Sequence, residues 1–554
     1  MSYAVGGALL VAVAAGWRYR LRARRMLHLL QLEHYESARL RLWLARRGEQ
    51  GDPLELGTQA GLAVAGLVLA IAGVTAAELA AWVALLLALG AFARREPAQG
   101  EIKPLVFTQR ARRLFAVSLL VPGACGLLGV ALSIALSSDV PMAAAALAVI
   151  VCLGLCARLL AAANLSLAPI QRRINRRFES CARAQLAAVD PVVVGITGSY
   201  GKTTTKVCIG AVLSEREPTL ITPASFNSYL GVIRAINEGL EPAHRNFVVE
   251  MGMYRAGDIA ELCELVGPQI GVLTAIGPVH LERMGTLDAI ADAKAELALA
   301  LRPDGQLVAN GDDPRCVEIA GRVTIDTLLY GLESPDARVR AQEIELADGR
   351  THFSLVIDGE QIPVSSGLLG RHNVSNLLAA AAVGHLRGMS IAEIARGLER
   401  VAPPEHRLQP ISNVRAGIVV IDDAYNSNPA GAAAALEVLH SHPAKRRILV
   451  TPGMVELGDQ EAELNECFGR QAAAVCDRVI LVGPQRTRPI AAGLRAEGFD
   501  PEGIDVVRDI AGATAVLGRM TRAGDVVLFE NDLPDMYSEA AAAPAAGALT
   551  AGAA

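Results

Sequence analysis

The 554-residue sequence predicts two α/β domains with an α-helical transmembrane region ahead of them. Three observations predict this class. A glycine-rich loop at residues 195–206 stands between an apolar run and a helical stretch, and short apolar runs then alternate with helical stretches. Such alternation is typical of a mostly parallel sheet covered on both faces. In addition, five apolar runs precede residue 160.

The five apolar runs cover residues 3–17, 60–77, 79–93, 114–136 and 140–157. A spanning helix needs about 20 apolar residues, so the second, fourth and fifth runs predict membrane spans, whereas the first and third are short. A buried helical bundle is the alternative interpretation. The first run has no basic segment ahead of it and no cleavage site, which favours a retained anchor over a signal peptide.

The placement of charge predicts an orientation. Lysines and arginines cluster after the first, third and fifth runs, and the other two connections have none. By the positive-inside rule, the N-terminus lies outside and the region after residue 180 lies in the cytoplasm. The predicted location is therefore the inner (cytoplasmic) membrane, multi-pass, with envelope-synthesis membrane proteins as possible partners.

Net charge separates the two halves of the chain. Residues 1–180 hold 20 Lys and Arg against 10 Asp and Glu, and the remainder holds 32 against 47. Juxtamembrane arginines favour anionic headgroups, and an acidic second half argues against a nucleic-acid partner. The nine cysteines include no C-x-x-C pair, so no zinc ribbon or disulfide framework is predicted.

Residues 164–190 are predicted to form an amphipathic connecting helix. Ile170, Ile174, Phe178 and Cys181 recur at helical spacing after Pro169, with arginines between them. This helix would lie on the membrane surface or pack on the domain that follows.

The loop Gly195–Lys206 predicts a nucleoside triphosphate site. Its glycines let backbone N–H groups turn toward an anion, and the helix that follows adds the positive end of its dipole. Lys202 would reach the terminal phosphates, and the hydroxyl of Thr203 would bind Mg²⁺.

Candidate strands follow in order along both domains. They lie at residues 192–194, 219–221, 247–249, 270–274, 306–309, 417–421, 448–451, 479–482 and 525–529. The stretch 338–366 predicts antiparallel strands appended to the first sheet.

The loop spacing, G-x-x-G-x-x-G-K-T-T-T, resembles that of the Mur ligases, which join amino acids to the peptidoglycan stem. Further segments resemble motifs of the same family, in order: 247–252, 277–285 with 293–296, 370–376, 421–429 and 453–458. The resemblance covers about residues 192–528. It is nearest to the branch that adds D-alanyl-D-alanine to a UDP-linked tripeptide.

The resemblance implies a P-loop central domain at 191–408 and a Rossmann-like C-terminal domain at 409–538. The transmembrane region then covers 1–163, with about five helices, and residues 539–554, rich in Ala, Gly and Pro, form a disordered tail.

The resemblance also implies ATP, two Mg²⁺ ions and a set of site residues. The phosphate-side residues are Gly198, Gly201, Lys202, Thr203 and Thr204. The metal-binding residues are Thr203 and Glu250 for the first ion, and His280 and Lys294 for the second. Lys294 would carry a CO₂-derived carbamate, and Lys202, Lys294 and His280 are the catalytic candidates.

A second group of residues would complete the nucleotide site. Asn373 and Asn376 resemble adenine contacts, although Asn373 could instead cap its helix. Arg407 resembles a phosphate contact and Asp423 a ribose contact. The inter-domain candidates are Tyr425, Asn426 and Asn428, for which turn chemistry is the alternative.

The sequence departs from the family in two places. Membrane helices occupy the position of the UDP-binding domain, and Leu528–Asp532 replaces the usual Lys-Gly-Ser with an acidic edge suited to a cationic amine. Three functions follow. The first is a membrane-anchored, ATP-dependent amide ligase that joins an amino acid or amine to a membrane-linked or polymeric carboxylate acceptor. The second is a tripeptide–D-alanyl-D-alanine ligase on the UDP-linked substrate, and the third is a P-loop transporter or sensor.

Overall fold

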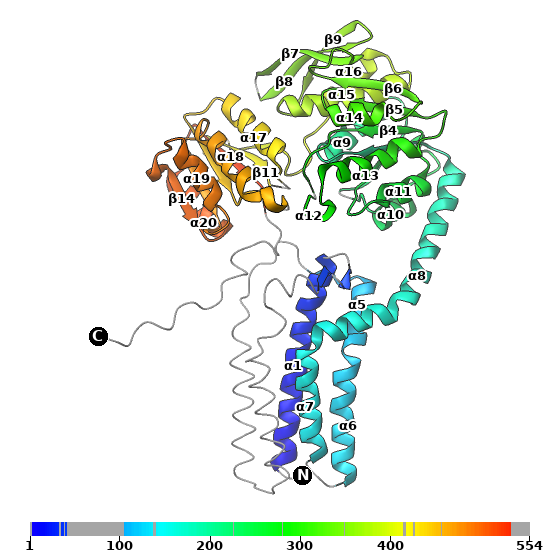
Figure 1. Ribbon diagram of the computed structural model, residues 1–554, viewed down its shortest axis with the longest axis vertical. Coiled ribbons are helices and arrows are strands. Elements are labelled where there is room, and N and C mark those ends of the chain that lie inside the picture. Colours follow the sequence, from blue (N-terminus) through cyan, green and yellow to red (C-terminus); the bar gives the residue numbers. More distant parts are fainter. Residues whose placement is uncertain are drawn as a thin grey trace. The chain divides into compact units, whose positions relative to one another are not determined.

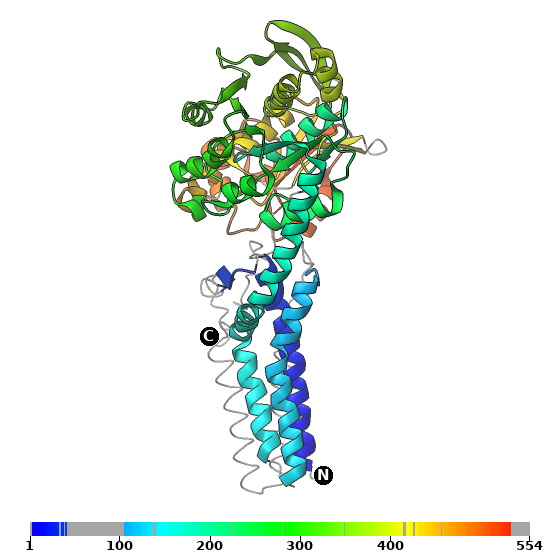
Figure 2. The same cartoon turned by 90° about the vertical axis from the view of Figure 1, so that its right-hand side faces the viewer.

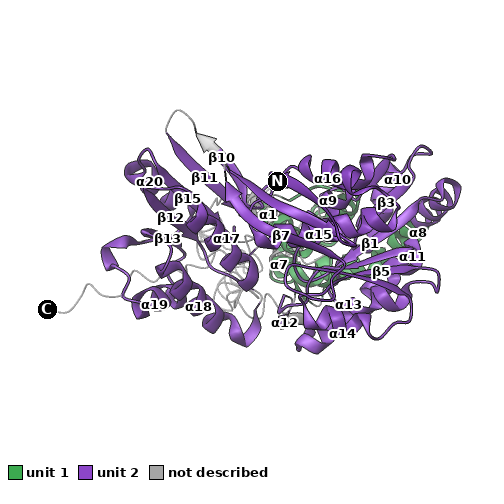
Figure 3. Ribbon diagram, turned by 90° about the horizontal axis from the view of Figure 1, so that it is seen from above, with its two compact units in different colours: residues 1–176 green, residues 177–554 purple. Residues whose placement is uncertain are grey.

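The computed structural model divides the chain into two compact units, residues 1–176 and 177–554 (Figure 3). It describes residues 3–32, 35–37, 39–40, 105–136, 140–224, 226–279, 281–347, 349–413, 417–424, 427–455 and 457–532.

The first unit is a helical bundle. Helices α1, α6 and α7 run side by side in both Figure 1 and Figure 2. The core is apolar, and the hydroxyl of Tyr19 inside it donates to the carbonyl of Ser118 at 2.9 Å. The helices are α1 (Tyr3–Leu32), α5 (Gln109–Ser118), α6 (Leu120–Leu136), α7 (Val140–Gly154) and the start of α8 (Cys156–Val189).

The helices of this unit do not match the predicted set of spans. Within the described residues, one helical stretch, 109–136, is long and apolar enough to cross a membrane, judged by length and composition alone. Helix α1 carries five arginines in its second half. Helix α7 has 15 residues, about 22 Å of helix against a hydrocarbon core of about 30 Å. The apolar runs 60–77 and 79–93 lie outside the described residues.

Helix α8 differs from the predicted connecting helix in where it begins. It starts at Cys156, so it runs through the predicted boundary at residue 164, and Pro169 lies within it. Its last turns pack on the central domain, where Ala182 is fully buried and Arg183 donates to the carbonyl of Glu264 at 3.0 Å. The connecting helix was predicted either to lie on the membrane surface or to pack on the domain that follows, and the last turns of α8 pack on that domain.

The second unit begins with a nine-stranded sheet in the order β2-β3-β1-β4-β5-β6-β7-β8-β9. Strands β2 to β7 pair in parallel, and β7, β8 and β9 pair antiparallel, as the stretch 338–366 predicts. The strands are β1 (Val192–Thr197), β2 (Thr219–Ile221), β3 (Asn246–Glu250), β4 (Ile270–Leu273), β5 (Gln306–Asn310), β6 (Asp326–Gly331), β7 (Val339–Ala347), β8 (Arg350–Ile357) and β9 (Glu360–Ser366).

Helices cover both faces of this sheet because its central strands are apolar on both sides. Val194 faces a core shared with α9, α15 and α16, and its neighbour Val193 faces a core shared with α10, α11 and α13. The helices are α9 (Lys202–Ser214), α10 (Tyr229–Gly239), α11 (Asp258–Val266), α12 (Leu281–Met284), α13 (Leu287–Ala300), α14 (Pro314–Ala320), α15 (Arg371–Leu386) and α16 (Ile391–Glu399).

The C-terminal domain contains a six-stranded sheet in the order β10-β11-β15-β12-β13-β14, parallel except for β10. Apolar cores lie on both of its faces. The strands are β10 (Gln409–Asn413), β11 (Ile418–Asp423), β12 (Arg446–Thr451), β13 (Arg478–Val482), β14 (Ile504–Val507) and β15 (Asp525–Glu530). The helices are α17 (Pro429–Ser441), α18 (Glu461–Ala473), α19 (Arg488–Ala496) and α20 (Ile510–Met520), with short 3₁₀ turns at Gly458–Gln460 and Pro501–Gly503.

Candidate active site

The predicted phosphate loop joins β1 to α9 at the carboxyl edge of the central sheet, where α/β proteins bind ligands. Gly201 caps α9 with φ of 78°, and no side chain caps the helix, so the N–H groups of its first turn face the loop. A Cβ atom on Gly201 would lie 2.3 Å from Oδ1 of Asn376, and one on Gly198 would lie 1.9 Å from Oγ1 of Thr274. Both glycines are therefore required by close packing.

Lys202 folds back over this loop. Its Nζ donates to the carbonyl of Gly198 at 2.7 Å. Burial lowers the pKa of Lys202, the carboxylate of Glu250 opposes that shift, and the positive charge of Arg407 adds to it. A cation held this way in a poorly solvated loop is well placed to pair with phosphate oxygens.

Glu250 ends β3 and is 2% exposed. Its Oε2 accepts hydrogen bonds from Oγ1 of Thr203 at 3.0 Å and from Nζ of Lys206 at 3.1 Å, and its Oε1 accepts from Nδ2 of Asn227 at 2.9 Å. Burial alone would raise the pKa of Glu250, but Lys206 and Lys202 lower it below its ordinary value. The carboxylate is therefore ionised and fixed in orientation.

Sequence reasoning assigned no role to Lys206 or Asn227. Lys206 is 1% exposed and also donates to the carbonyl of Ala224. Burial lowers the pKa of Lys206, and Glu250 opposes that shift. One feature of the sequence could have indicated its role: Lys206 lies one helical turn after Lys202, on the side of α9 that faces β3. Asn227 lies in a loop that gave no signal.

Lys294 is buried in α13, 3% exposed. No residue in the described part of the chain forms a hydrogen bond or ion pair with it. Burial lowers its pKa well below the ordinary value, Lys202 adds to the shift and Cys316 opposes it. Because the charge of Lys202 acts on Lys294, the two amines belong to the same region of the site. His280, the predicted neighbour, lies outside the described residues.

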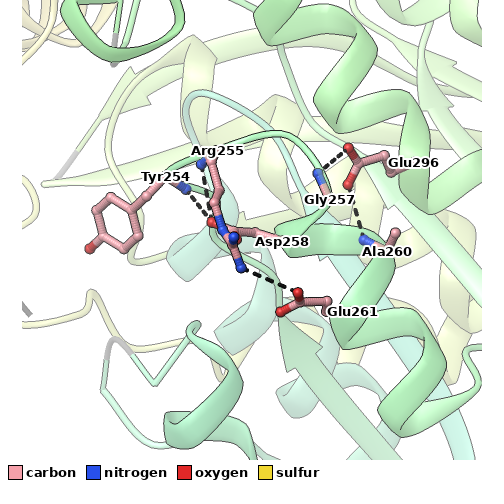
Figure 4. A network of polar contacts seen from close by, with 7 residues as sticks. All are labelled: Tyr254, Arg255, Gly257, Asp258, Ala260, Glu261 and Glu296. Carbon is pink, nitrogen blue, oxygen red and sulfur yellow. Dashed lines mark hydrogen bonds and ion pairs between the residues drawn. The ribbon is translucent and has the colours of Figure 1, made fainter. Parts of the chain in front are cut away.

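Glu296 holds the helix that carries Lys294. Its carboxylate accepts from the backbone N–H groups of Gly257 at 2.7 Å and Ala260 at 3.0 Å (Figure 4). These groups open α11, whose first residue, Asp258, accepts in turn from the N–H groups of Tyr254 and Arg255. Glu296 thus acts as a helix cap from another element and fixes α13 against α11.

The predicted adenine contacts are hydrogen-bonded within the protein. Oδ1 of Asn376 accepts from Oγ1 of Thr205 at 3.1 Å, which ties α15 to α9. Nδ2 of Asn376 donates to Oδ1 of Asn373 at 3.1 Å, and Nδ2 of Asn373 donates to the carbonyl of Leu369 at 2.8 Å. Gly370, not Asn373, is the N-cap of α15, so the alternative capping role of Asn373 is wrong.

Arg407 lies between two residues with left-handed backbone, His406 with φ of 59° and Leu408 with φ of 47°. Its Nη2 donates to Oγ1 of Thr203 at 3.4 Å, so the structure brings it to the phosphate loop. Asp423 accepts from the N–H of Leu408 at 3.1 Å, and a carboxylate oxygen of Asp422 lies 2.7 Å from Nδ1 of His406. Two aspartates at the end of β11 therefore hold the segment that presents Arg407.

Asp423 and Asn428, two of the C-terminal candidates, are buried or hydrogen-bonded within their own domain. Burial raises the pKa of Asp423 to about 6, although Leu408 and Arg407 oppose the shift. Asn428 caps α17 by accepting from the N–H of Gly431 at 2.8 Å, the turn chemistry that was its alternative interpretation. Tyr425 and Asn426 lie outside the described residues.

The acidic end of β15 points inward. Glu530 is 1% exposed and accepts hydrogen bonds from Oγ1 of Thr451 at 2.9 Å and from the hydroxyl of Ser427. Glu530 therefore does not contribute to the acidic edge predicted for residues 528–532, because it is buried and each of its oxygens accepts a hydrogen bond from the protein. Asn531, with φ of 67°, donates to the carbonyl of Gly453 at 2.6 Å.

Two family models match the second unit. The Mur ligase middle domain matches residues 196–384, and the Mur ligase glutamate ligase domain matches residues 406–530.

Individual proteins agree with the family models. The UDP-N-acetylmuramoyl-tripeptide–D-alanyl-D-alanine ligase of Mycobacterium tuberculosis is 34% identical over 378 residues, which cover 64% of this chain and 72% of that ligase. The ligase of the same name from Synechocystis is 34% identical over 341 residues, 61% of this chain and 71% of the relative. MurF of Thermotoga maritima in complex with ADP superposes with a TM-score of 0.59 at 25% identity, over 66% of this chain and 82% of that structure. MurF of Acinetobacter baumannii superposes with a TM-score of 0.57 at 28% identity, over 65% of this chain and 77% of that structure.

These findings correct two predictions. The predicted multi-pass location in the inner membrane is wrong: the described helices include one stretch of sufficient length and apolarity, and the relatives are ligases named for a UDP-linked substrate. For the same reason the comparisons favour the ligase on a UDP-linked tripeptide over the membrane-anchored ligase with a membrane-linked acceptor. They also exclude the transporter or sensor, because the matched proteins are ligases.

Three findings indicate the same family: the glycine loop, the buried Glu250 beside Thr203, and the matches along both α/β domains. The chain is an ATP-dependent ligase that forms an amide bond, and members of its family use ATP and Mg²⁺. It belongs to the Mur ligase family, in the branch of the D-alanyl-D-alanine-adding ligases.

Proposed function

We propose that this ligase joins D-alanyl-D-alanine to a carboxylate of a UDP-linked N-acetylmuramoyl tripeptide. The proposal is carried by one observation: Lys202, Thr203 and Glu250 converge at the loop of a chain 34% identical to ligases of that name. A carboxylate oxygen is a poor leaving group at neutral pH. Transfer of the ATP γ-phosphoryl group to it gives an acyl phosphate and ADP. The amine of the dipeptide then attacks the acyl carbon, and phosphate leaves with the oxygen.

All the reacting groups are anionic at first, so cations must offset their repulsion. In this proposal Lys202 pairs with the terminal phosphates, and the loop N–H groups bind their oxygens. Arg407 adds a second positive charge, a guanidinium group, from the C-terminal side. It already lies 3.4 Å from Oγ1 of Thr203.

The residues beside the loop fit a Mg²⁺ ion. Thr203 and Glu250 offer a hydroxyl and a carboxylate oxygen 3.0 Å apart, and Mg²⁺ takes oxygen ligands of this kind. Mg²⁺ held by these residues would supply positive charge that offsets the negative charge developing on the phosphates. Lys206 and Asn227 hold the Glu250 carboxylate in one orientation. Binding of Mg²⁺ would therefore require little further ordering of this side chain.

Lys294 suits a carbamate that would serve a second Mg²⁺. It is almost fully buried, and no described residue accepts a hydrogen bond from it. The carbamate would turn this cation into a carboxylate-like anion able to bind a metal, and Glu296 would keep its helix in place. This part of the proposal rests on burial and on the lack of a protein partner within the described ranges.

The experiment that tests the function is a coupled assay on the full chain. ATP, Mg²⁺, UDP-N-acetylmuramoyl tripeptide and D-alanyl-D-alanine should together release phosphate and yield a product heavier by the dipeptide less water, measured by mass spectrometry. Omitting either the UDP-linked tripeptide or D-alanyl-D-alanine should stop phosphate release, and Lys202→Ala should be inactive. L-alanyl-L-alanine serves as the matched substrate control. Absence of the UDP-linked product under these conditions would refute the proposed substrates.

A further inference from the structure

A basic pocket lies in the first unit, where α5 meets α8. Arg110 and Arg113 stand three residues apart on α5, so they share one face of the helix. Nη2 of Arg110 donates to Oδ1 of Asn164 at 3.3 Å, and Nη2 of Arg113 donates to Oε1 of Gln171 at 3.0 Å. The two amides stand seven residues apart on α8, so they also share a face. Each guanidinium is thus aimed by a neutral amide.

Within the described ranges, no acidic side chain pairs with the positive charge in this pocket. Among the residues that the structure describes, neither Arg110 nor Arg113 forms an ion pair. Burial lowers the pKa of Arg110, Tyr35 opposes the shift and Arg113 adds to it. The guanidinium carbon of Arg110 lies 4.0 Å from the centroid of the Tyr35 ring. Two half-buried guanidinium groups are held close enough to repel each other. Such an arrangement favours binding of an anion between them.

Hydrogen bonds hold the two amides that contact the arginines. Nδ2 of Asn164 donates to the carbonyl of Tyr35 at 2.9 Å and to the hydroxyl of Ser37 at 3.2 Å. Nε2 of Gln171 donates to Oδ1 of Asn175 at 2.7 Å. These bonds fix the oxygen of each amide toward its arginine, so the positions of the two guanidinium groups are set before any ligand arrives.

The remaining walls of the pocket are apolar. Leu114, Leu167 and Ile170 line it together with the two arginines and two amides. Each guanidinium has five N–H donors and uses one of them on an amide oxygen of α8, and both arginines line the pocket. A tetrahedral oxyanion has enough acceptor oxygens to serve both arginines at once, whereas a carboxylate has two.

We propose that this pocket binds a phosphate group, either free or as part of an anionic headgroup. The proposal does not depend on the proposed ligase substrates. Arg110 and Arg113 would each pair with phosphate oxygens, and the apolar wall would accept a carbon chain next to the phosphate if one is present.

The test uses the full chain with Lys202→Ala in every protein, so that the phosphate loop competes less for the probes. The soluble probes are inorganic pyrophosphate and acetate, and calorimetry measures their binding. The membrane probes are vesicles of phosphatidylcholine with or without phosphatidylglycerol, and flotation measures binding to them. Arg110→Gln and Arg113→Gln should each weaken binding of the phosphate-bearing probe roughly tenfold, because each removes charge-assisted hydrogen bonds. Arg112→Gln is the matched control, since Arg112 lies on the same helix, is exposed and does not line the pocket.

Each outcome decides the proposal. Binding of pyrophosphate that is lost in both pocket variants and kept in Arg112→Gln supports it and identifies a free phosphate. The same pattern with phosphatidylglycerol vesicles alone supports it and identifies a headgroup. Equal weakening by all three variants would show a general basic face and overturn the proposal, as would tighter binding of acetate or no binding of any probe. Unfolding curves of the variants show whether each is folded, and Arg113→Gln, which leaves the Tyr35 stacking intact, is the safer of the two.

Discussion

Nζ of Lys206 lies 3.1 Å from Oε2 of Glu250, and both side chains are 2% exposed. The pair joins α9, which follows the phosphate loop, to the end of β3. Oγ1 of Thr203 donates to the same Oε2 atom, so Lys206 and Thr203 together set the orientation of the carboxylate proposed to bind Mg²⁺. A lysine 44 positions away in the sequence thereby positions Glu250.

The first prediction concerns this ion pair. Lys206→Met should lower the free energy of unfolding by about 3 kcal/mol, because breaking a buried pair leaves a buried charge with fewer partners. Turnover should also fall, since Glu250 loses the partner that fixes its position. Chemical denaturation and phosphate release measure the two effects. The double variant Lys206→Met/Glu250→Gln should recover part of the stability and none of the turnover. Normal stability and turnover in Lys206→Met would contradict the positioning role.

The second prediction concerns Gly201. Gly201→Ala should weaken ATP binding by more than about tenfold, because its Cβ would lie 2.3 Å from Oδ1 of Asn376 and would push α15 away from the loop. Gly257 is the matched control: it also caps a helix with positive φ, 92°, but nothing lies within 4 Å of its Cβ position. Gly257→Ala should therefore cost only the backbone strain, about 1–2 kcal/mol, and keep ATP affinity. Equal ATP affinity in the two variants would contradict the steric argument.

The sequence predicted the core strands well because they are continuous apolar runs. Strand β2 is predicted to the residue, β4 with one residue too many, and β1, β3 and β5 in part. It missed β6, β10 and β14. These strands include polar residues such as Asp326, Gln409 and Asp505, which interrupt the apolar pattern. Strands β10 and β14 are the edges of the C-terminal sheet, whereas β6 lies inside the central sheet between β5 and β7, and all three form through tertiary pairing. The roles of Lys206 and Glu296 were missed for the same reason, because each depends on an element distant in the sequence.

The third prediction is a pH dependence of stability from Glu530. Burial raises the pKa of Glu530 to about 7 from an ordinary value of 4.5, and hydrogen bonds from Ser427 and Thr451 oppose the shift. The folded state therefore binds the proton more tightly than the unfolded state. Stability should fall as the pH rises from about 4.5 to about 7, by about 3 kcal/mol in all. Denaturation curves across this range measure the loss.

Glu530→Gln should flatten that pH dependence. Asp525 provides a control of opposite sign: burial alone would raise its pKa, but Arg446 lowers it below the usual value. Its contribution is present above the unfolded pKa and is lost as the pH falls through the folded pKa, so Asp525→Asn should destabilise the protein at neutral pH. A steep fall in stability between pH 4.5 and 7 that persists in Glu530→Gln would assign the effect to another group.

The last prediction tests the carbamate proposed on Lys294. If its role is to present an anion to Mg²⁺, Lys294→Ala should lose activity on the order of 10²-fold or more. Lys294→Arg keeps the positive charge but cannot form the same carbamate, so it should be as inactive as the alanine variant. Acetate should fit the space vacated in Lys294→Ala and restore part of its turnover, and depletion of CO₂ should slow only the unaltered enzyme. Phosphate release under each condition is the measurement. An active arginine variant would show that the site needs a cation at this position, and the carbamate would then be excluded.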